Sequence, residues 1–117
     1  MDCRDEMTDA QRTARIRALN DHLRTTGLGG KTMLTRAVAE LPPPVLEALL
    51  TVVRSFDGFT ADNDPWGEHD FGSVQVGDEA FFWKIDCYDT NLEFGSPDPA
   101  DDTISRRVLT VMVAADL

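Results

Sequence analysis

Basic side chains are almost absent from the middle of this sequence. Residues 55–103 contain thirteen acidic residues and a single basic one, Lys84, whereas the segments on either side are nearly neutral, so the middle accounts for the net charge of −10. A segment with this charge repels the phosphates of nucleic acids and membrane surfaces and attracts cations and basic proteins. We therefore expect no direct contact with nucleic acid or membrane, and a basic protein or nucleic-acid-binding complex as the partner.

Apolar runs and cysteines are also scarce. No stretch approaches the roughly 18 apolar residues of a membrane span, and the first ten positions lack the apolar core of a secretory signal. The two cysteines, Cys3 and Cys87, are too few for a disulfide framework. We expect two free thiols in a cytoplasmic protein.

Helical periodicity occupies the first half of the chain. Thr8 and Gln11 have the spacing of a capping box and Gly27 is a natural C-cap, which predicts a helix over residues 9–26. Residues 31–35 can form a short strand. A second helix is predicted to begin at Pro44, and its apolar face includes the residues Val45, Leu46, Leu49, Leu50, Val53 and Phe56.

The second half shows the alternation typical of strands. Val74 and Val76 alternate with polar residues, a turn follows at residues 77–78, and residues 81–88 alternate again, which predicts a hairpin. Phe82 and Tyr88 point away from the apolar face of this second strand. They either pack under a helix or loop, or form an exposed patch.

The remaining segments complete the predicted architecture. Loops over residues 57–72 and 89–103 flank the hairpin, and the apolar run within residues 106–114 predicts a central strand. We expect an α+β fold with two N-terminal helices packed on a three- or four-stranded, mainly antiparallel sheet. We also expect residues 1–117 to form one domain, with residues 1–7 as a flexible tail.

The turn at Gly29-Gly30-Lys31-Thr32 has the ending of a phosphate-binding loop. The full pattern needs a glycine where Thr25 stands, and a strand, not a helix, in front of the loop. We therefore interpret these residues as a helix C-cap and turn, and reject an ATPase.

Residues 62–70, with the sequence DNDPWGEHD, are the densest concentration of polar chemistry in the chain. As a calcium loop the segment lacks the bidentate glutamate, because Ser73 stands at that position. A calcium or magnesium site of another kind, built from Asp62, Asp64 and Asp70, stays open. With His69 moving protons, such a site would make the chain a metal-dependent hydrolase.

A catalytic group without metal is less well supported by the same segment. Glu68 and His69 can serve as acid and base with Asp70 orienting the imidazole, but adjacent residues of a strand point to opposite faces. Two histidines, His22 and His69, are too few for a zinc site. The structural interpretation is favoured, with turns at residues 62–67 and His69 bonded to a loop carbonyl.

A second acidic cluster, Asp98, Asp101 and Asp102, lies in the loop that follows the hairpin. Such a cluster is usually a solvated loop. If the two acidic loops meet at one edge of the sheet, their carboxylates can imitate the phosphates of nucleic acid for a protein that binds it.

Long segments of the sequence resemble one uncharacterised family. Residues 62–72, 82–89 and 95–101, together with 15–21 and 107–112, resemble small acidic bacterial proteins that carry a domain of unknown function and are common in alphaproteobacteria and mobile elements. The resemblance implies no established activity, and its link to mobile DNA suggests a role in conflict between element and host by analogy alone. Trp66 and Cys87 depart from the family's usual His or Tyr, and the departure at position 66 weakens a metal site.

Two functions from different classes follow. The first is a non-enzymatic acidic protein-binding module without a cofactor, most specifically an inhibitor of a host nucleic-acid-binding defence complex of the anti-CRISPR or antirestriction type, acting as a DNA mimic. The alternative is the metal-dependent hydrolase, and a third option is a subunit of a larger assembly. For the first function, the predicted partner-binding residues are Asp62, Asp64, Glu68, Asp70, Asp98, Asp101 and Asp102.

Overall fold

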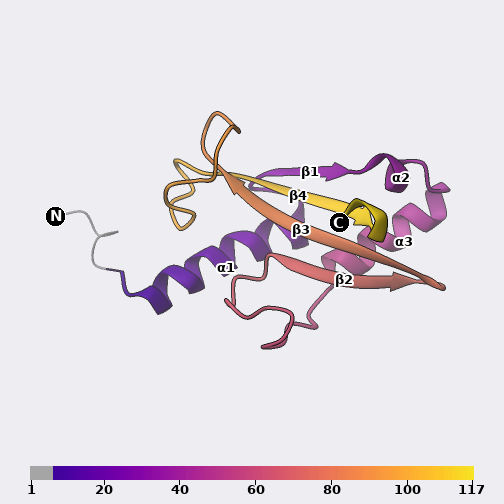
Figure 1. Ribbon diagram of the computed structural model, residues 1–117, viewed down its shortest axis with the longest axis horizontal. Helices are drawn as coiled ribbons and strands as arrows, with labels where there is room; N and C mark the ends of the chain where they lie inside the picture. Colours follow the sequence, from indigo (N-terminus) through magenta and orange to yellow (C-terminus); the bar gives the residue numbers. More distant parts are fainter. Residues whose placement is uncertain (1–6) are drawn as a thin grey trace.

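A four-stranded sheet with the strand order β1-β4-β3-β2 forms the centre of the computed structural model, which describes residues 7–117 (Figure 1). β1 runs parallel to β4, and the other pairs are antiparallel, so the sheet is mixed and mostly antiparallel, as predicted. The elements in chain order are α1 (Asp9–Thr26), β1 (Lys31–Leu34), α2 (Arg36–Ala39), α3 (Pro43–Arg54), β2 (Phe71–Val76), β3 (Glu79–Tyr88), β4 (Arg106–Val113) and the 3₁₀ turn η2 (Ala114–Asp116). Residues 1–6 lie outside the described residues. They include Cys3 and all of the expected tail except Met7.

Helix α1 has the two ends that the sequence predicts. The Thr8 side chain accepts a hydrogen bond from the Gln11 amide at 3.1 Å, and the Gln11 side chain accepts one from the Thr8 amide at 2.8 Å. Gly27 ends the helix in the left-handed conformation, with φ of 77°, which a residue without Cβ adopts without strain. The capping box and the C-cap are therefore confirmed.

The proline-rich connection differs from the prediction in detail. Pro42 occupies the N-cap of α3 and Pro43 its first turn, so the helix begins one residue earlier than predicted and ends at Arg54, before Phe56. A short helix, α2, also precedes it, which the prediction missed. Four residues are too few to show a helical period, so no pattern in the sequence marks α2.

The hairpin and the central strand are confirmed. Val76 pairs with Glu79 across the two-residue turn, and β4 lies between β1 and β3. Because β4 lies between two strands of the sheet, its side chains are surrounded by those of β1 and β3. This central position explains its nearly continuous apolar sequence.

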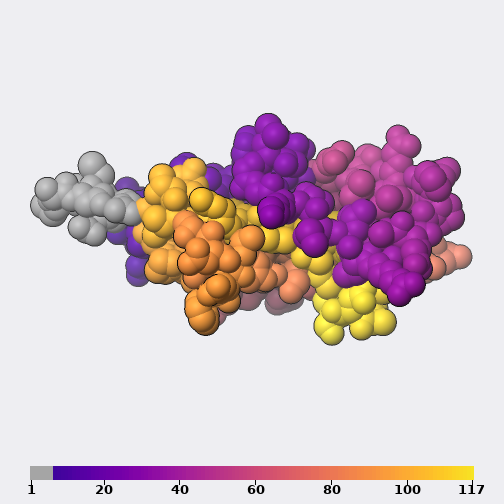
Figure 2. Space-filling view, turned by 90° about the horizontal axis from the view of Figure 1, so that it is seen from above, coloured from indigo at the N-terminus to yellow at the C-terminus, as the bar shows by residue number. Residues whose placement is uncertain are grey.

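The main core fills the space between one face of the sheet and the helices α1 and α3. Trp83 and Phe81 of β3 and Val111 of β4 pack there against Leu23 of α1 and Leu49 of α3, and all five are fully buried. Figures 1 and 2 show η2 on the opposite side of the sheet.

No helix within residues 7–117 is long and apolar enough to cross a membrane.

The second face of the sheet is only partly covered. Phe82 and Tyr88 are half-buried on this face, and the Phe82 ring stacks on that of Phe71 with centroids 6.1 Å apart. Of the two alternatives for Phe82, packing on a neighbour is the one observed, but the neighbour is a strand residue and not a helix.

Candidate functional site

Both acidic loops are anchored to helix α1. The first acidic loop, residues 57–70, accepts hydrogen bonds at the backbone oxygens of Gly67 and Glu68, from Arg17 Nε at 2.7 Å and Asn20 Nδ2 at 2.9 Å respectively. These contacts join positions about fifty residues apart in the chain. They fix the position of the loop along the axis of α1.

The second acidic loop, residues 89–105, meets the same helix through ion pairs. Arg12 lies 3.1 Å from Asp98, and Arg15 lies 3.9 Å from Asp102. Basic residues of α1 therefore offset part of the negative charge of this loop.

One buried arginine joins the two loops through α1. Arg107 of β4 donates from Nε to Asn20 Oδ1 at 2.8 Å and from Nη2 to the backbone oxygen of Pro99. Asn20 in turn donates to Glu68 O, so one asparagine side chain serves both loops. Burial lowers the pKa of Arg107 from its usual value, which the nearby charges of Asp102 and Glu68 partly counteract.

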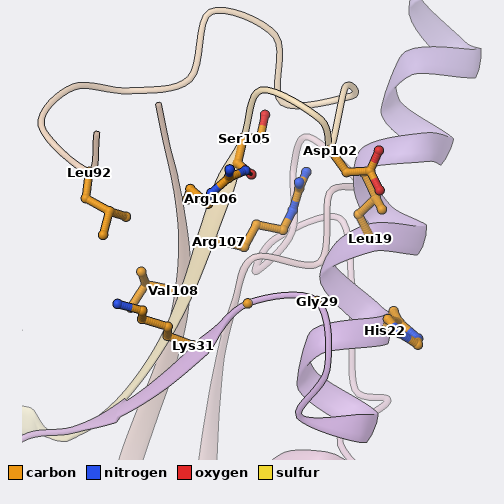
Figure 3. A pocket seen from close by; sticks show the side chains of 11 residues that line it. Leu19, His22, Gly29, Lys31, Leu92, Asp102, Ser105, Arg106, Arg107 and Val108 are labelled. Carbon is orange, nitrogen blue, oxygen red and sulfur yellow. Dashed lines mark hydrogen bonds between the residues drawn. The ribbon is translucent and has the colours of Figure 1, made fainter. Parts of the chain in front are cut away.

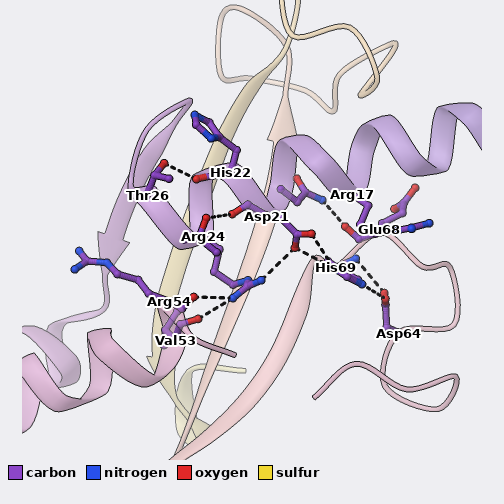
Figure 4. Close-up of polar contacts among 12 residues, drawn as sticks. Arg17, Asp21, His22, Arg24, Thr26, Val53, Arg54, Asp64, Glu68 and His69 are labelled. Carbon is purple, nitrogen blue, oxygen red and sulfur yellow. Dashed lines mark hydrogen bonds and ion pairs between the residues drawn. The ribbon is translucent and has the colours of Figure 1, made fainter. Parts of the chain in front are cut away.

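A histidine clamp fixes the end of the first acidic loop (Figure 4). His69 Nδ1 lies 2.9 and 3.1 Å from the two carboxylate oxygens of Asp21 on α1, and since a carboxylate only accepts, Nδ1 carries the proton. Asp64 accepts from the His69 amide at 3.2 Å and lies 3.6 Å from Nε2. The imidazole also stacks on Phe59 with ring centroids 3.6 Å apart. Its Nδ1 atom and one face of the ring are thus occupied, and the ring has a structural role.

These contacts correct two expectations about His69. Asp21, 48 positions away, orients the imidazole, and Asp70 does not. The clamp is also made by carboxylates and not by a loop carbonyl. The backbone of His69 is left-handed, with φ of 55°, so Glu68 and His69 lie in a turn and the strand geometry used in the prediction does not apply.

Buried Arg24 contacts Asp21, the carboxylate that holds the His69 ring. Its Nη2 donates to Asp21 Oδ1 at 3.1 Å, and its Nη1 donates to the last carbonyls of α3, those of Val53 at 3.1 Å and Arg54 at 3.2 Å. The guanidinium also lies 5.2 Å from the centroid of the Trp83 ring, within cation–π distance. One side chain therefore connects α1, α3, the core and the histidine clamp.

The seven predicted partner-binding residues fall into three groups. The Asp64 side chain is only 6% exposed and contacts His69, and buried Asp101 accepts from the Thr103 amide and hydroxyl, so both shape their loops. Asp98 and Asp102 pair with arginines of α1. Within the described residues, the predicted positions that have no ion-pair partner are Asp62, Glu68 and Asp70.

Glu68 and Asp70 lie in a locally negative environment. Burial, followed by the negative charges of Asp70 and Asp64, raises the pKa of Glu68, which Arg107 partly counteracts. Burial also raises the pKa of Asp70, and the charges of Asp64 and Asp86 add to the rise. At neutral pH the fold therefore holds two carboxylates close together where their ionisation is disfavoured.

Removing these two charges should stabilise the protein near neutral pH. A carboxyl whose pKa is raised in the fold binds its proton more tightly there than in the unfolded chain, so its contribution to stability is present at low pH and is lost as the pH rises through the raised pKa. We expect Glu68→Gln with Asp70→Asn to increase the free energy of unfolding at pH 7 by roughly 0.5 kcal/mol, a value reduced for solvent screening. Urea titrations between pH 3 and 8 measure the difference, which should shrink as the pH falls. A loss of stability at pH 7 would contradict the assignment.

The predicted metal ligands do not converge. Asp62 is exposed, whereas Asp64 is committed to His69. Within residues 7–117, no three histidine, cysteine, aspartate or glutamate side chains gather closely enough to hold a metal ion. The metal-dependent hydrolase therefore has no observation of the site in its favour.

Trp66 is the residue of the first acidic loop that sequence analysis underrated. Its side chain is 80% exposed at a turn in which the Gly67 amide donates to Asp64 O at 3.1 Å. A side chain of this size offers a partner a large apolar contact area together with a polar N–H group. The available signal was its position between acidic residues in a polar loop, where no apolar face needs it.

The chain matches one family of proteins over most of its length. Residues 34–116 match the family described as "Protein of unknown function (DUF3768)". The resembling segments 62–72, 82–89, 95–101 and 107–112 lie inside the match, whereas residues 15–21 of α1 lie outside it. No curated protein and no solved structure matches the chain. The chain belongs to the uncharacterised DUF3768 family.

Proposed function

We propose that this protein is a non-enzymatic binding module whose first acidic loop docks onto a basic protein surface. The observation that carries the proposal is exposed Trp66, which lies in the same loop as the three predicted partner-binding carboxylates that have no ion-pair partner among residues 7–117. Interface hot spots combine a large aromatic side chain with charges that select the partner. The three carboxylates belong to Asp62, Glu68 and Asp70.

Two properties of the loop support this role. The His69 clamp and the contacts with Arg17 and Asn20 fix its shape before any partner arrives, and a fixed loop loses little conformational entropy on binding. The raised pKa values of Glu68 and Asp70 also mean that a cation from a partner would relieve an existing repulsion.

The partner that we favour is a host nucleic-acid-binding defence complex, which the protein would inhibit in the cytoplasm as a DNA mimic of the anti-CRISPR or antirestriction kind. The support is the charge of residues 55–103, which has the sign of nucleic acid. Since Asp98 and Asp102 pair with arginines, the mimicking surface in this proposal centres on the first acidic loop.

Affinity capture from bacterial lysate with matched variants tests the proposal. We expect a basic protein to be retained at low salt and released at moderate salt, because charge steering weakens with ionic strength. Glu68→Gln with Asp70→Asn, and separately Trp66→Ala, should reduce retention about tenfold or more. The first variant is expected to be at least as stable as the natural protein, so its loss of binding would not reflect unfolding.

The control variant is Asp78→Asn with Glu79→Gln, which removes the same charge from the exposed hairpin turn. Its retention should equal that of the natural protein. Equal loss in both double variants would show that net charge alone causes retention, and would contradict the loop assignment. Release of the captured protein by short duplex DNA is expected for a DNA mimic, whereas retention in excess DNA would contradict mimicry while leaving the binding module intact.

A further inference from the structure

A basic pocket lies between the α1–β1 turn and the start of β4, at the edge of the sheet opposite β2 (Figure 3). Its volume is about 430 Å³, within the range of about 300–1,000 Å³ typical of sites for small molecules. The lining includes Leu19, His22, Lys31, Asp102, Arg106 and Arg107.

The charge of this pocket is opposite to that of the protein. Three basic side chains line it, Lys31, Arg106 and Arg107, and Asp102 is the acidic residue among the lining residues. Asp102 also lies near Arg15, outside the pocket. The pocket is therefore a positive site in a chain whose net charge is −10.

None of the three cations forms an ion pair with a carboxylate within residues 7–117, but Arg107 is engaged by Asn20 and by the Pro99 carbonyl. Within residues 7–117, neither Lys31 nor Arg106 forms an ion pair, although the chain has 21 acidic and 11 basic residues. Both lie on the same face of the sheet, since Lys31 pairs with Val108 and Arg106 precedes Val108 by two residues. Their two charges match those of a phosphate dianion.

The backbone around the pocket is fixed by close packing. A Cβ on Gly30 would lie 2.5 Å from the backbone oxygen of Arg107, so the α1–β1 turn approaches β4 more closely than another residue would allow. Arg106 Nη1 donates to Ser105 O at 2.9 Å, which leaves the other N–H donors of its guanidinium for a ligand.

An apolar hollow continues from the basic pocket across the open face of the sheet. It has a volume of about 480 Å³ and shares Lys31, Leu92 and Val108 with the basic pocket. Met33 and Tyr88 complete its apolar wall, and Met33 is exposed. A ligand with a charged group in the basic pocket therefore finds a place for an apolar or aromatic body beside it.

We propose that this pocket binds a small phosphorylated molecule, with the phosphate held by Lys31 and Arg106 and an apolar body resting against Met33 and Tyr88. The phosphate-binding side chains lie on the β1 and β4 side of the sheet, whereas the first acidic loop leads into β2 at the other edge, and the proposal does not rest on the proposed partner binding. The glycine and lysine of the rejected phosphate-loop motif thus take part in a different kind of phosphate site, in which side chains and not a helix N-terminus hold the anion.

Titration with phenyl phosphate, followed by amide NMR shifts and calorimetry, tests the proposal. We expect saturable binding with a dissociation constant below about 10 mM, with the largest shifts at Gly29, Gly30, Ser105 and Val108. Inorganic phosphate should bind more weakly, because it lacks the apolar body. Lys31→Gln and Arg106→Gln should each weaken binding at least about fivefold, whereas Arg36→Gln, which removes an exposed charge outside the pocket, should not.

Several outcomes would overturn the proposal. The absence of saturable binding would do so, as would shifts that map to another surface or equal affinities in all three variants. Benzoate bound as tightly as phenyl phosphate would contradict the choice of a dianion, and phenol bound as tightly would show that the anion is not recognised. The proposed partner binding is read out separately, since Lys31→Gln should leave capture by the first acidic loop unchanged.

Discussion

Replacing Arg24 with methionine is expected to lower the free energy of unfolding by about 3 kcal/mol, because a buried cation and its hydrogen bonds are lost together. Arg24 is only 4% exposed, and its guanidinium donates to Asp21 and to the last carbonyls of α3. Methionine fills a similar volume without donors. The Val53 and Arg54 carbonyls then lose their donor, and Asp21 keeps His69 alone.

Urea unfolding of the variant and of Arg36→Met separates this effect from a general effect of charge. Arg36 is 91% exposed and pairs with Glu40, the C-cap residue of α2, so its replacement should change stability by less than about 0.5 kcal/mol. A loss below about 1 kcal/mol for the Arg24 variant would show that the guanidinium is not the joint between α1 and α3 that its contacts indicate.

Most of the fold follows from local patterns in the sequence. The ends of α1 are encoded within four residues of each end, by the Thr8 capping box and by Gly27. The β2–β3 hairpin is encoded by alternation on either side of a glycine turn, and the central place of β4 by its apolar run. Each of these signals is short-range, which explains why one sequence suffices to detect them.

The site depends on contacts that no local pattern contains. The residues that clamp the first acidic loop belong to α1, about fifty positions away, and as a sequence they form only the polar face of a helix. The burial of the Asp64 and Asp101 side chains is equally invisible, because burial follows from the packing of loops against that helix. An acidic loop could therefore be located from sequence, whereas the use of each carboxylate could not be assigned.

Part of the negative charge of residues 55–103 is paired with arginines in the folded protein, which the sequence alone does not show. The arginines of α1 and β4 are not distributed at random over the surface: Arg12 and Arg15 face the second acidic loop, and Arg107 links both loops. Much of the negative charge is thereby used to fold the loops. The carboxylates left over on the first acidic loop and the cations left over at the basic pocket are the charges available for ligands.

Replacing Asn20 with leucine should lower the free energy of unfolding by about 3 kcal/mol and should also weaken partner binding, since buried polar groups in both loops lose their partners. The buried Asn20 side chain accepts from Arg107 Nε at 2.8 Å and donates to Glu68 O at 2.9 Å. Leucine has a similar size and can do neither. Arg107 Nε and Glu68 O would then be left without the partner that they have in the fold.

Aspartate at the same position separates the two contacts. Asn20→Asp keeps the acceptor for Arg107 and pairs it with a charge, while it removes the donor to Glu68 O. We expect a loss of about 1 kcal/mol, well below that of leucine, together with a looser first acidic loop and weaker capture of the partner. Urea unfolding and capture at matched salt measure the two effects. If aspartate costs as much stability as leucine, the link to Arg107 is not the stabilising contact, and the two loops are held to α1 by their ion pairs and the His69 clamp instead.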